Sequence, residues 1–218
     1  MNTKPKLYGY WRSSSSYRVR IALALKHLEY ETVPIHLVKD GGQQHAAEWK
    51  VKNPMEQVPL LEIEHEPGHV VSLTQSVAIL EYLEERFPEP PLLPKCAYLR
   101  ARVRKVVEIV NSAIQPMQNL SMLRTLRELG ADAQAFGRAA NERGLAAIEA
   151  EAVDAGGRFT IGDEVTLADV LLVPQLFSAR RFSADMSRFP RLGEIEARLL
   201  AMPEVAAAHP DKQPDAEP

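Results

Sequence analysis

Residues 6–27 read K-L-Y-G-Y-W-R-S-S-S-S-Y-R-V-R-I-A-L-A-L-K-H and hold the clearest fold signal in the sequence. A short β-type run, Lys6–Tyr10, leads into the polar segment Arg12–Ser16 and then into a helical stretch, Arg18–His27, with a broad apolar face. A strand that passes through a hydroxyl-rich loop into a helix is typical of an α/β domain. The sequence therefore predicts such a domain at its N-terminal end.

The residues that follow continue this alternation of strands and helices. Glu31–Val38 is rich in β-branched residues and predicts a strand, and Ala46–Lys52 predicts a short polar helix. Val58–Ile63 and Val70–Leu73 predict two strands joined by a tight turn, and Gln75–Phe87 predicts an amphipathic helix. The resulting order, β-α-β-α-β-β-α, describes a small α/β sandwich.

Beyond residue 88 the pattern changes to helices alone. Four prolines, Pro88, Pro90, Pro91 and Pro94, form a stiff linker, because proline neither continues a helix nor donates to a sheet. We expect the tail from His209 onward to be disordered. The helices predicted between linker and tail are 98–114, 118–129, 133–155, 166–176 and 191–201.

The composition excludes several classes of protein. Of the 218 residues, 45% are hydrophobic and 25% are charged, which is ordinary for a globular protein with a buried core. The net charge of −3 argues against a nucleic-acid-binding protein, which usually carries an excess of basic residues. Cys96 is the only cysteine, so a disulfide framework and a cysteine-based zinc site are excluded. The six histidines lack the spacing of metal ligands, and we expect no bound metal.

The sequence also lacks the segments that direct a chain to a membrane. The N-terminal residues lead into no apolar run, so we expect no signal peptide. The longest apolar stretch, Ala168–Phe177, is interrupted by Asp169, Pro174 and Gln175 and is far shorter than a membrane span. We therefore expect a cytoplasmic protein without membrane or nucleic-acid partners.

The serines after the first strand allow two interpretations. A helix N-terminus has free N–H groups and about half a positive charge, so hydroxyl groups placed there favour an anion. Alternatively, one serine is an ordinary N-cap and the others are solvated turn residues. The pair Gln75-Ser76, at the start of a later predicted helix, leaves the same choice open. A serine hydrolase is disfavoured because the sequence has no G-x-S-x-G motif.

One further helix start is interpreted as a folding signal only. The segment Thr166-Leu167-Ala168-Asp169 has the form of a capping box with an aspartate at the third helical position. Val165 and Val170 are placed to pack across it as a hydrophobic staple. We predict that Asp169 contributes to stability and takes no part in chemistry.

Longer motifs extend over nearly the whole chain. In the first half they are S-S-S-S-Y-R-V-R-I-A-L-A-L-K from residue 13, Y-E-T-V-P-I-H-L-V-K-D-G-G-Q-Q from residue 30, N-P-M-E-Q-V-P-L-L from residue 53 and T-Q-S-V-A-I-L-E-Y-L from residue 74. In the second half they are I-Q-P-M-Q-N-L-S from residue 114, G-D-E-V-T-L-A-D-V-L-L-V-P-Q from residue 162 and H-P-D-K-Q-P-D from residue 209. With these motifs, the sequence from about Lys6 to Asp215 resembles the zeta-class glutathione transferases.

The resemblance implies a fold, a cofactor and an assembly. The fold class is α/β plus all-α, with a thioredoxin-like glutathione-binding domain at residues 5–88, a linker at 89–96 and an all-helical substrate-binding domain at 97–210. Glutathione is the implied cofactor, and a homodimer is the implied assembly. The family holds the bond between Val58 and Pro59 in the cis form, which implies that the Val58 backbone pairs with the tripeptide like an added strand.

The resemblance also implies site residues. The catalytic candidates are Ser13, Ser14 and Ser15, and the substrate-binding candidates are Arg181 and Arg12. For Arg181 the alternative of a surface arginine near a helix end stays open. The implied glutathione contacts are Ser13, Ser14, Ser15, Ser16, Tyr17, Arg18, Gln44, Val58, Gln75, Ser76, Gln115, Asn119, Leu120 and Ser121.

The chain departs from the family pattern at one of these positions. Where the family has S-S-C, this chain has Ser15 in place of the cysteine. A mechanism that uses a protein thiol in this loop is therefore excluded. A mechanism in which glutathione supplies the sulfur remains open, and the effect of the serine falls on the tuning of that thiol.

The implied activity is a glutathione-dependent cis–trans isomerisation of a small dicarboxylic keto acid. Thiolate adds reversibly to the double bond, so that rotation becomes possible before the thiolate leaves. The expected reaction converts maleylacetoacetate to fumarylacetoacetate in tyrosine and phenylalanine catabolism. Three alternatives stay open: maleylpyruvate as the substrate, another zeta-like transferase activity, and a glutathione-binding protein with little catalysis.

Overall fold

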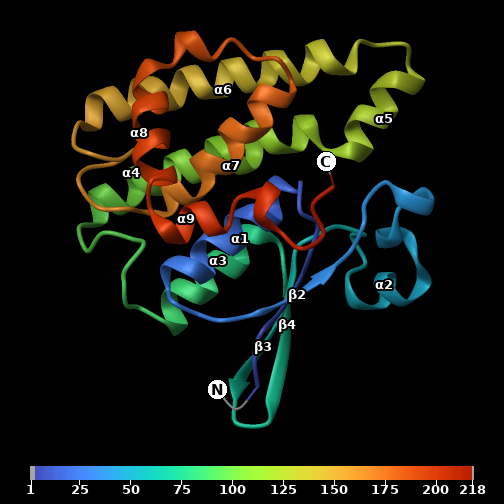
Figure 1. Cartoon of the computed structure of the whole chain (residues 1–218). Helices are drawn as coiled ribbons and strands as arrows, with labels where there is room; N and C mark the ends of the chain where they lie inside the picture. The colour runs from blue at the N-terminus through green and yellow to red at the C-terminus, as the bar shows by residue number, and fades with distance from the viewer. Residues whose placement is uncertain (1–2, 218) are drawn as a thin grey trace. The chain divides into compact units, whose positions relative to one another are not determined.

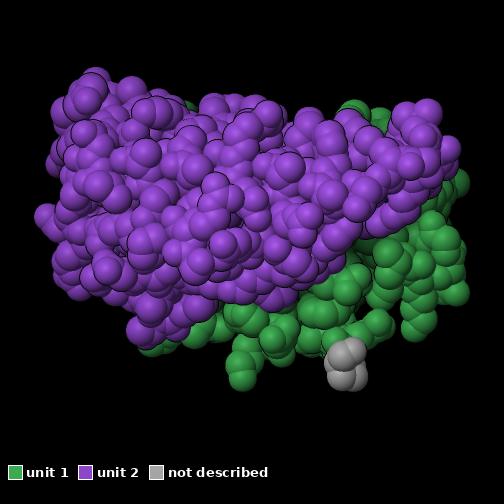
Figure 2. All heavy atoms as spheres, turned by 90° about the horizontal axis from the view of Figure 1, so that it is seen from above, with its two compact units in different colours: residues 1–90, 203–218 green, residues 91–202 purple. Residues whose placement is uncertain are grey.

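The computed structural model describes residues 3–217 and divides the chain into two compact units. Unit 1 consists of residues 1–90 and 203–218, and unit 2 consists of residues 91–202 (Figure 2). The predicted helical domain, 97–210, shares residues 97–202 with unit 2, whereas residues 203–210 group with unit 1. The domain limits themselves remain a prediction.

A four-stranded mixed sheet forms the centre of unit 1 (Figure 1). Its strands are β1 (Lys6–Gly9), β2 (Glu31–Pro34), β3 (Leu60–Glu66) and β4 (His69–Thr74), in the order β2-β1-β3-β4. β1 pairs with β2 in parallel, with Leu7 opposite Thr32, and both other pairings are antiparallel. This sheet and its flanking helices confirm the predicted thioredoxin-like fold.

Helices cover the sheet of unit 1. α1 (Ser14–Leu25) packs beside α3 (Ser76–Arg86), and α2 (Ala47–Lys52) follows two short 3₁₀ turns at 39–41 and 43–45. α1 begins four residues before the predicted start at Arg18, because Ser13 accepts a hydrogen bond from the Ser16 N–H and so caps the helix early. The serines thus lie at a helix N-terminus.

The C-terminal tail differs from its prediction. We expected disorder from His209 onward, but the described tail is ordered and belongs to unit 1. α9 (Pro203–Ala207) packs on α1, and a 3₁₀ turn follows at Pro210–Lys212. The polar, proline-rich composition of the tail predicts disorder. The tail is ordered because hydrogen bonds join it to residues near the other end of the chain. One of these joins the Arg20 side chain to the Ala208 carbonyl at 3.0 Å.

Unit 2 is all-helical, as predicted. Its helices are α4 (Ala97–Glu108), α5 (Leu120–Glu128), α6 (Ala133–Ala155), α7 (Leu167–Arg181) and α8 (Pro190–Leu200). The predicted continuous helix 98–114 is wrong in its last part, where Ile109–Ile114 form a π-helix and Gln115–Gln118 a 3₁₀ turn. Ile114 packs so closely on Gly144 of α6 that a Cβ there would lie 2.3 Å from its side chain. Only a residue without a Cβ leaves room for the Ile114 side chain at position 144.

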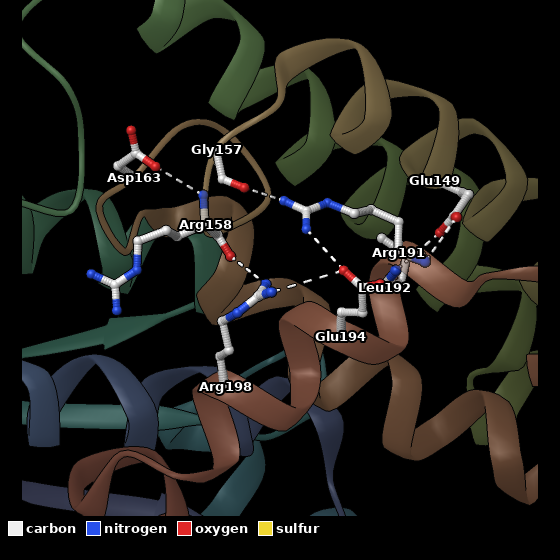
Figure 3. Close-up of polar contacts among 8 residues, drawn as sticks. All are labelled: Glu149, Gly157, Arg158, Asp163, Arg191, Leu192, Glu194 and Arg198. Carbon is white, nitrogen blue, oxygen red and sulfur yellow. Dashed lines mark hydrogen bonds and ion pairs between the residues drawn. The ribbon is translucent and has the colours of Figure 1, made fainter.

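Two arginines of α8 hold the connection between α6 and α7 (Figure 3). Arg191 donates to the carbonyl of Gly157, and Arg198 donates to the carbonyl of Arg158 at 2.9 Å. The carboxylate of Glu149 accepts the first two N–H groups of α8, both at 3.0 Å. Since these side chains satisfy backbone hydrogen-bonding groups, we assign Glu149, Arg191 and Arg198 a role in folding.

The predicted capping box at the start of α7 is confirmed. Asp169 is fully buried, and its carboxylate accepts four hydrogen bonds, two from Thr166 and two from Thr160. Burial raises the pKa of Asp169, and the four donors oppose that rise. Among the described residues, no helix combines the length and the apolar character that crossing a membrane requires.

Candidate functional site

The loop after β1 leads into α1, whose N-terminus is capped by Ser13 but keeps some backbone N–H groups without hydrogen-bond partners. Ser13 Oγ accepts from the Ser16 N–H at 3.2 Å, and the Ser13 carbonyl accepts from the Tyr17 N–H at 2.9 Å. The interpretation of one serine as an N-cap is therefore correct. A hydroxyl that accepts a hydrogen bond keeps its own proton, so the Ser13 O–H group still has a hydrogen bond to donate.

The next two serines leave the start of α1 open. Ser14 and Ser15 are half-buried, and the described residues supply no partner for their hydroxyls or for their backbone N–H groups. No acidic residue stands in the first turn of α1. The partial positive charge of the helix N-terminus and these four donors therefore have no counterpart among the described residues.

A second helix start lies nearby in unit 1, because α1 and α3 pack against each other. Arg18 of α1 donates from Nη1 to Ser76 Oγ of α3 at 3.0 Å. Arg18 is 1% exposed, and its Nε and Nη2 have no hydrogen-bond partner within the described chain. Burial lowers the pKa of Arg18 to about 10, so the guanidinium is charged at neutral pH. A buried cation without a counter-ion favours an anionic ligand at this point.

The backbone at the start of α3 suits the same ligand. Gln75 adopts a left-handed conformation, with φ 67° and ψ 111°, and no side chain caps the helix. Its side chain is exposed and contacts Gln57 at 3.4 Å. The first N–H groups of α3 are therefore free to bind a carboxylate, as helix N-termini do.

Val58 and Gln44 offer further unused backbone and side-chain groups. The Val58–Pro59 bond is cis, as the resemblance implies. Within residues 3–217, neither backbone group of Val58 has a hydrogen-bond partner. Gln44 is buried and donates from Nε2 to the Leu37 carbonyl at 3.1 Å, while its Oε1 has no partner there. An extended peptide would find an acceptor and a donor at Val58 and an acceptor at Gln44.

The remaining predicted residues have mainly structural contacts in this structure. Asn119 is the N-cap of α5, where its Oδ1 accepts from Ser121 N and Ser121 Oγ, both at 3.1 Å. Arg12 lies over the Trp11 ring at 5.4 Å. Arg181 is exposed in the last turn of α7, and its carbonyl accepts from Gln134 at 3.0 Å. Gln115 and Leu120 lie on the 3₁₀ turn and at the start of α5.

Two features of the molecule escaped the sequence analysis. A cluster of side-chain amides joins half-buried Gln118 to buried Asn141 and Gln175, with Gln175 Nε2 donating to Asn141 Oδ1 at 2.6 Å. Asp215 of the tail accepts the Trp11 N–H at 3.0 Å, two residues before the first serine. The only sequence signal for the Asp215 contact was the motif H-P-D-K-Q-P-D, which belongs to the family pattern but does not indicate that Trp11 is the partner.

Comparisons with known proteins agree with this architecture. Residues 4–85 match the family model "Glutathione S-transferase, N-terminal domain". The maleylacetoacetate isomerase of Rattus norvegicus is 46% identical over 213 residues, covering 97% of this chain and 95% of that one. A crystal structure of maleylacetoacetate isomerase from Anaeromyxobacter dehalogenans 2CP-1, with dicarboxyethyl glutathione and citrate in its active site, has 49% identity, a TM-score of 0.88 and coverages of 99% and 94%. A bacterial maleyl pyruvate isomerase of the zeta class has 39% identity, a TM-score of 0.91 and coverages of 97% and 100%.

The fold and these matches define a zeta-class glutathione transferase. Within that class, the chain belongs to the maleylacetoacetate isomerase family. The resemblance seen in the sequence is thereby confirmed, and glutathione is the cofactor of the family. The alternative family, the maleyl pyruvate isomerases, matches at lower identity.

The residues of unit 1 fit glutathione, which is a tripeptide with a thiol and two carboxylates. The unpartnered nitrogens of Arg18 and the free start of α3 suit a carboxylate. The unpaired backbone of Val58 suits a peptide, and the unpaired hydroxyls of Ser14 and Ser15 suit an anionic sulfur. Each of these groups is unsatisfied in the described chain, which is the condition expected of a binding site.

Proposed function

We propose that this protein catalyses the glutathione-dependent isomerisation of maleylacetoacetate to fumarylacetoacetate. The observation that carries the proposal is the pair of open helix starts in unit 1, at Ser13–Ser15 and at Ser76 beside Arg18. The full-length match to maleylacetoacetate isomerases supports the same conclusion. Maleylpyruvate is the second candidate substrate, since a zeta-class maleyl pyruvate isomerase has the same fold.

Glutathione is proposed to lie along unit 1. The hydroxyls of Ser13, Ser14 and Ser15 face its sulfur, the Val58 backbone pairs with its peptide groups, and Ser76 with the start of α3 takes a carboxylate. The further contacts carried over from the family pattern are Ser16, Tyr17, Arg18, Gln44, Gln75, Gln115, Asn119, Leu120 and Ser121.

Hydroxyl groups and a helix start are sufficient to ionise the thiol. Glutathione supplies the nucleophilic sulfur that adds to and leaves the substrate's double bond, and a free thiol has a pKa of about 8.5. Lowering that pKa by about 2 corresponds to about 2.7 kcal/mol. A hydrogen bond to a charged group contributes about 1.5–3 kcal/mol, and a helix N-terminus about 0.3–1 kcal/mol. Ser13 and the start of α1 together supply this amount without a cysteine at position 15.

The substrate is a dianion, and its carboxylates need cationic partners. We assign this part to Arg181, with Arg12 as a second candidate. Arg12 stands in the segment of residues 10–15 that leads from β1 into the first turn of α1, which we call the serine loop. Arg181 lies in the last turn of α7. We further propose a cytoplasmic homodimer, which is the assembly implied by the family pattern.

The test is an ultraviolet assay of maleylacetoacetate loss, run with glutathione, with S-methylglutathione and with no thiol. Turnover is expected with glutathione alone, because the methylated compound has the same carboxylates but no ionisable sulfur. Full activity without a thiol would contradict the covalent mechanism. Retention on immobilised glutathione without any turnover would favour a binding protein, the alternative that Ser15 suggests. A parallel assay with maleylpyruvate separates the two candidate substrates.

A further inference from the structure

The end of the chain is bonded to the beginning of the serine loop. After α9 and the 3₁₀ turn at Pro210–Lys212, the tail reaches Asp215, whose Oδ2 accepts the Trp11 N–H at 3.0 Å. Trp11 stands two residues before the N-cap Ser13. Both partners belong to unit 1. A carboxylate that accepts a backbone N–H makes a stronger hydrogen bond than a neutral acceptor.

Arg20 makes the second connection between loop and tail. Its Nη2 donates to the Trp11 carbonyl at 2.9 Å, and its Nε donates to the Ala208 carbonyl at 3.0 Å. A longer contact of 3.5 Å joins Nη1 to the Tyr10 carbonyl. Arg20 is 2% exposed, so these are bonds within the protein that water does not replace. We call Arg20, Ala208 and Asp215 the tail strap.

The strap and the serines together bond the backbone of Tyr10 and Trp11, the two residues before Arg12. At Trp11, Asp215 holds the N–H and Arg20 holds the carbonyl. At Tyr10, the N–H contacts Ser16 Oγ at 3.5 Å, and the carbonyl accepts from the Ser13 N–H at 3.0 Å. The unpaired groups of Ser14 and Ser15 follow after Arg12 and Ser13. The bonded residues Tyr10 and Trp11 therefore stand just before a helix start whose donors have no partner in the described residues.

We infer that the tail strap is a positioning device for the serine loop, with Asp215 as the positioning residue that acts through the Trp11 N–H. This inference rests on the proposed function of the loop. Asp215 itself contacts no reacting atom. By fixing the peptide groups on both sides of Trp11, the strap sets the direction in which Ser13 and the start of α1 present their donors to the sulfur. A displacement of such groups by about 1 Å can reduce a rate by about 10²-fold.

The test compares three variants of the full-length protein. Asp215→Ala removes the acceptor, Asp215→Asn keeps an oxygen acceptor without the charge, and Asp211→Asn removes a charge from an exposed residue of the same tail. For each variant we would measure kcat/KM for the isomerisation, KM for glutathione, the melting temperature, and the ionisation of bound glutathione from the ultraviolet absorbance of its thiolate.

A positioning role predicts a distinct pattern. Asp215→Ala should lower kcat/KM about tenfold and raise the pKa of the bound thiol. Asp215→Asn should recover most of the rate, and Asp211→Asn should behave like the wild type. The inference is overturned if Asp215→Ala keeps the wild-type rate and thiol ionisation, or if only its melting temperature changes. Should the wild type itself show no turnover, the proposed function fails, while the thiolate absorbance still decides whether the strap positions the loop.

Discussion

The N-termini of α1 and α7 are both capped by a hydroxyl residue, but they differ in whether their first backbone N–H groups have hydrogen-bond partners. At α7, the Leu167 N–H reaches the Leu92 carbonyl at 2.8 Å, the Ala168 N–H reaches Thr166 Oγ1 at 3.3 Å, and Asp169 closes the capping box. At α1, Ser13 caps only the Ser16 N–H, and the two preceding N–H groups have no partner in the described chain. The difference lies in the acceptors: at α7 the Leu92 carbonyl and Thr166 Oγ1 take the first two N–H groups of the helix, which α1 leaves for a ligand. Asp169 adds a negative charge to the first turn of α7, and α1 has no such acid.

The largest effect is expected at the closed start. Asp169→Ala leaves the donors of Thr160 and Thr166 buried without partners, and each unsatisfied group costs about 1–3 kcal/mol. We expect a loss of about 3 kcal/mol in the free energy of unfolding, which corresponds to a melting temperature lower by about 6–12 °C for a chain of this size. Chemical and thermal denaturation measure it. The kcat per folded molecule should stay near the wild-type value, and a large fall in kcat would show that Asp169 serves the chemistry.

The next effect concerns the open start. Ser13→Ala removes the hydroxyl that we propose as a donor to the thiolate, a contribution of about 1.5–3 kcal/mol. The rate at pH 7 should fall about 10–100-fold, and the pH–rate profile should move to higher pH. The substitution also removes an N-cap, so Asp132→Ala is the matched control: Asp132 accepts the Ala135 N–H at 2.9 Å at the start of α6. An equal rate loss in both variants would assign the effect to capping alone.

A smaller effect separates binding from folding at Arg18. Arg18→Met replaces a buried, incompletely bonded guanidinium with an apolar side chain of similar length. We expect the dissociation constant of glutathione to rise about tenfold, with a melting temperature that stays equal or rises, because an uncompensated buried charge is removed. Calorimetric titration measures the first quantity. A glutathione analogue without the γ-glutamyl α-carboxylate should bind both proteins alike, and a tenfold loss for that analogue as well would remove Arg18 from the carboxylate site.

The smallest effect is expected from restoring the family residue. Ser15→Cys should change the rate at pH 7 by less than about threefold, because Ser13 and the helix start already account for the ionisation of the thiol. The pH–rate profiles of Ser15→Cys and Ser13→Ala, recorded together, decide the matter. If the cysteine variant shifts its profile further than the alanine variant does, position 15 is the principal contact of the sulfur.

The sequence predicted those elements whose causes are local. The β-type run before the serines, the hairpin around Gly68 and the capping box of α7 all depend on residues within a few positions of one another. The π-helix at Ile109–Ile114 was missed, because its residues have ordinary helical spacing and the close contact of Ile114 is with Gly144 on another helix.

The same distinction holds for the candidate site. The serines and Ser76 could be named from the family motifs, and their positions at two helix starts follow from local patterns. The sequence could not show that two nitrogens of Arg18 are buried without hydrogen-bond partners, since their burial depends on the packing of α1 against α3. The order of the tail was missed for a related reason, because Asp215 meets its partner 204 residues earlier in the chain.

That separation of 204 residues has a consequence for how the protein is made. Unit 1 is built from both ends of the chain, while unit 2 is continuous. A ribosome therefore completes every residue of unit 2 before it adds Asp215, and chains emerge at about 5–20 residues per second. Until Asp215 leaves the exit tunnel, the Trp11 N–H lacks this partner. We expect a nascent chain to hold the serines of the first strand–helix connection long before the residue that fixes the backbone in front of them.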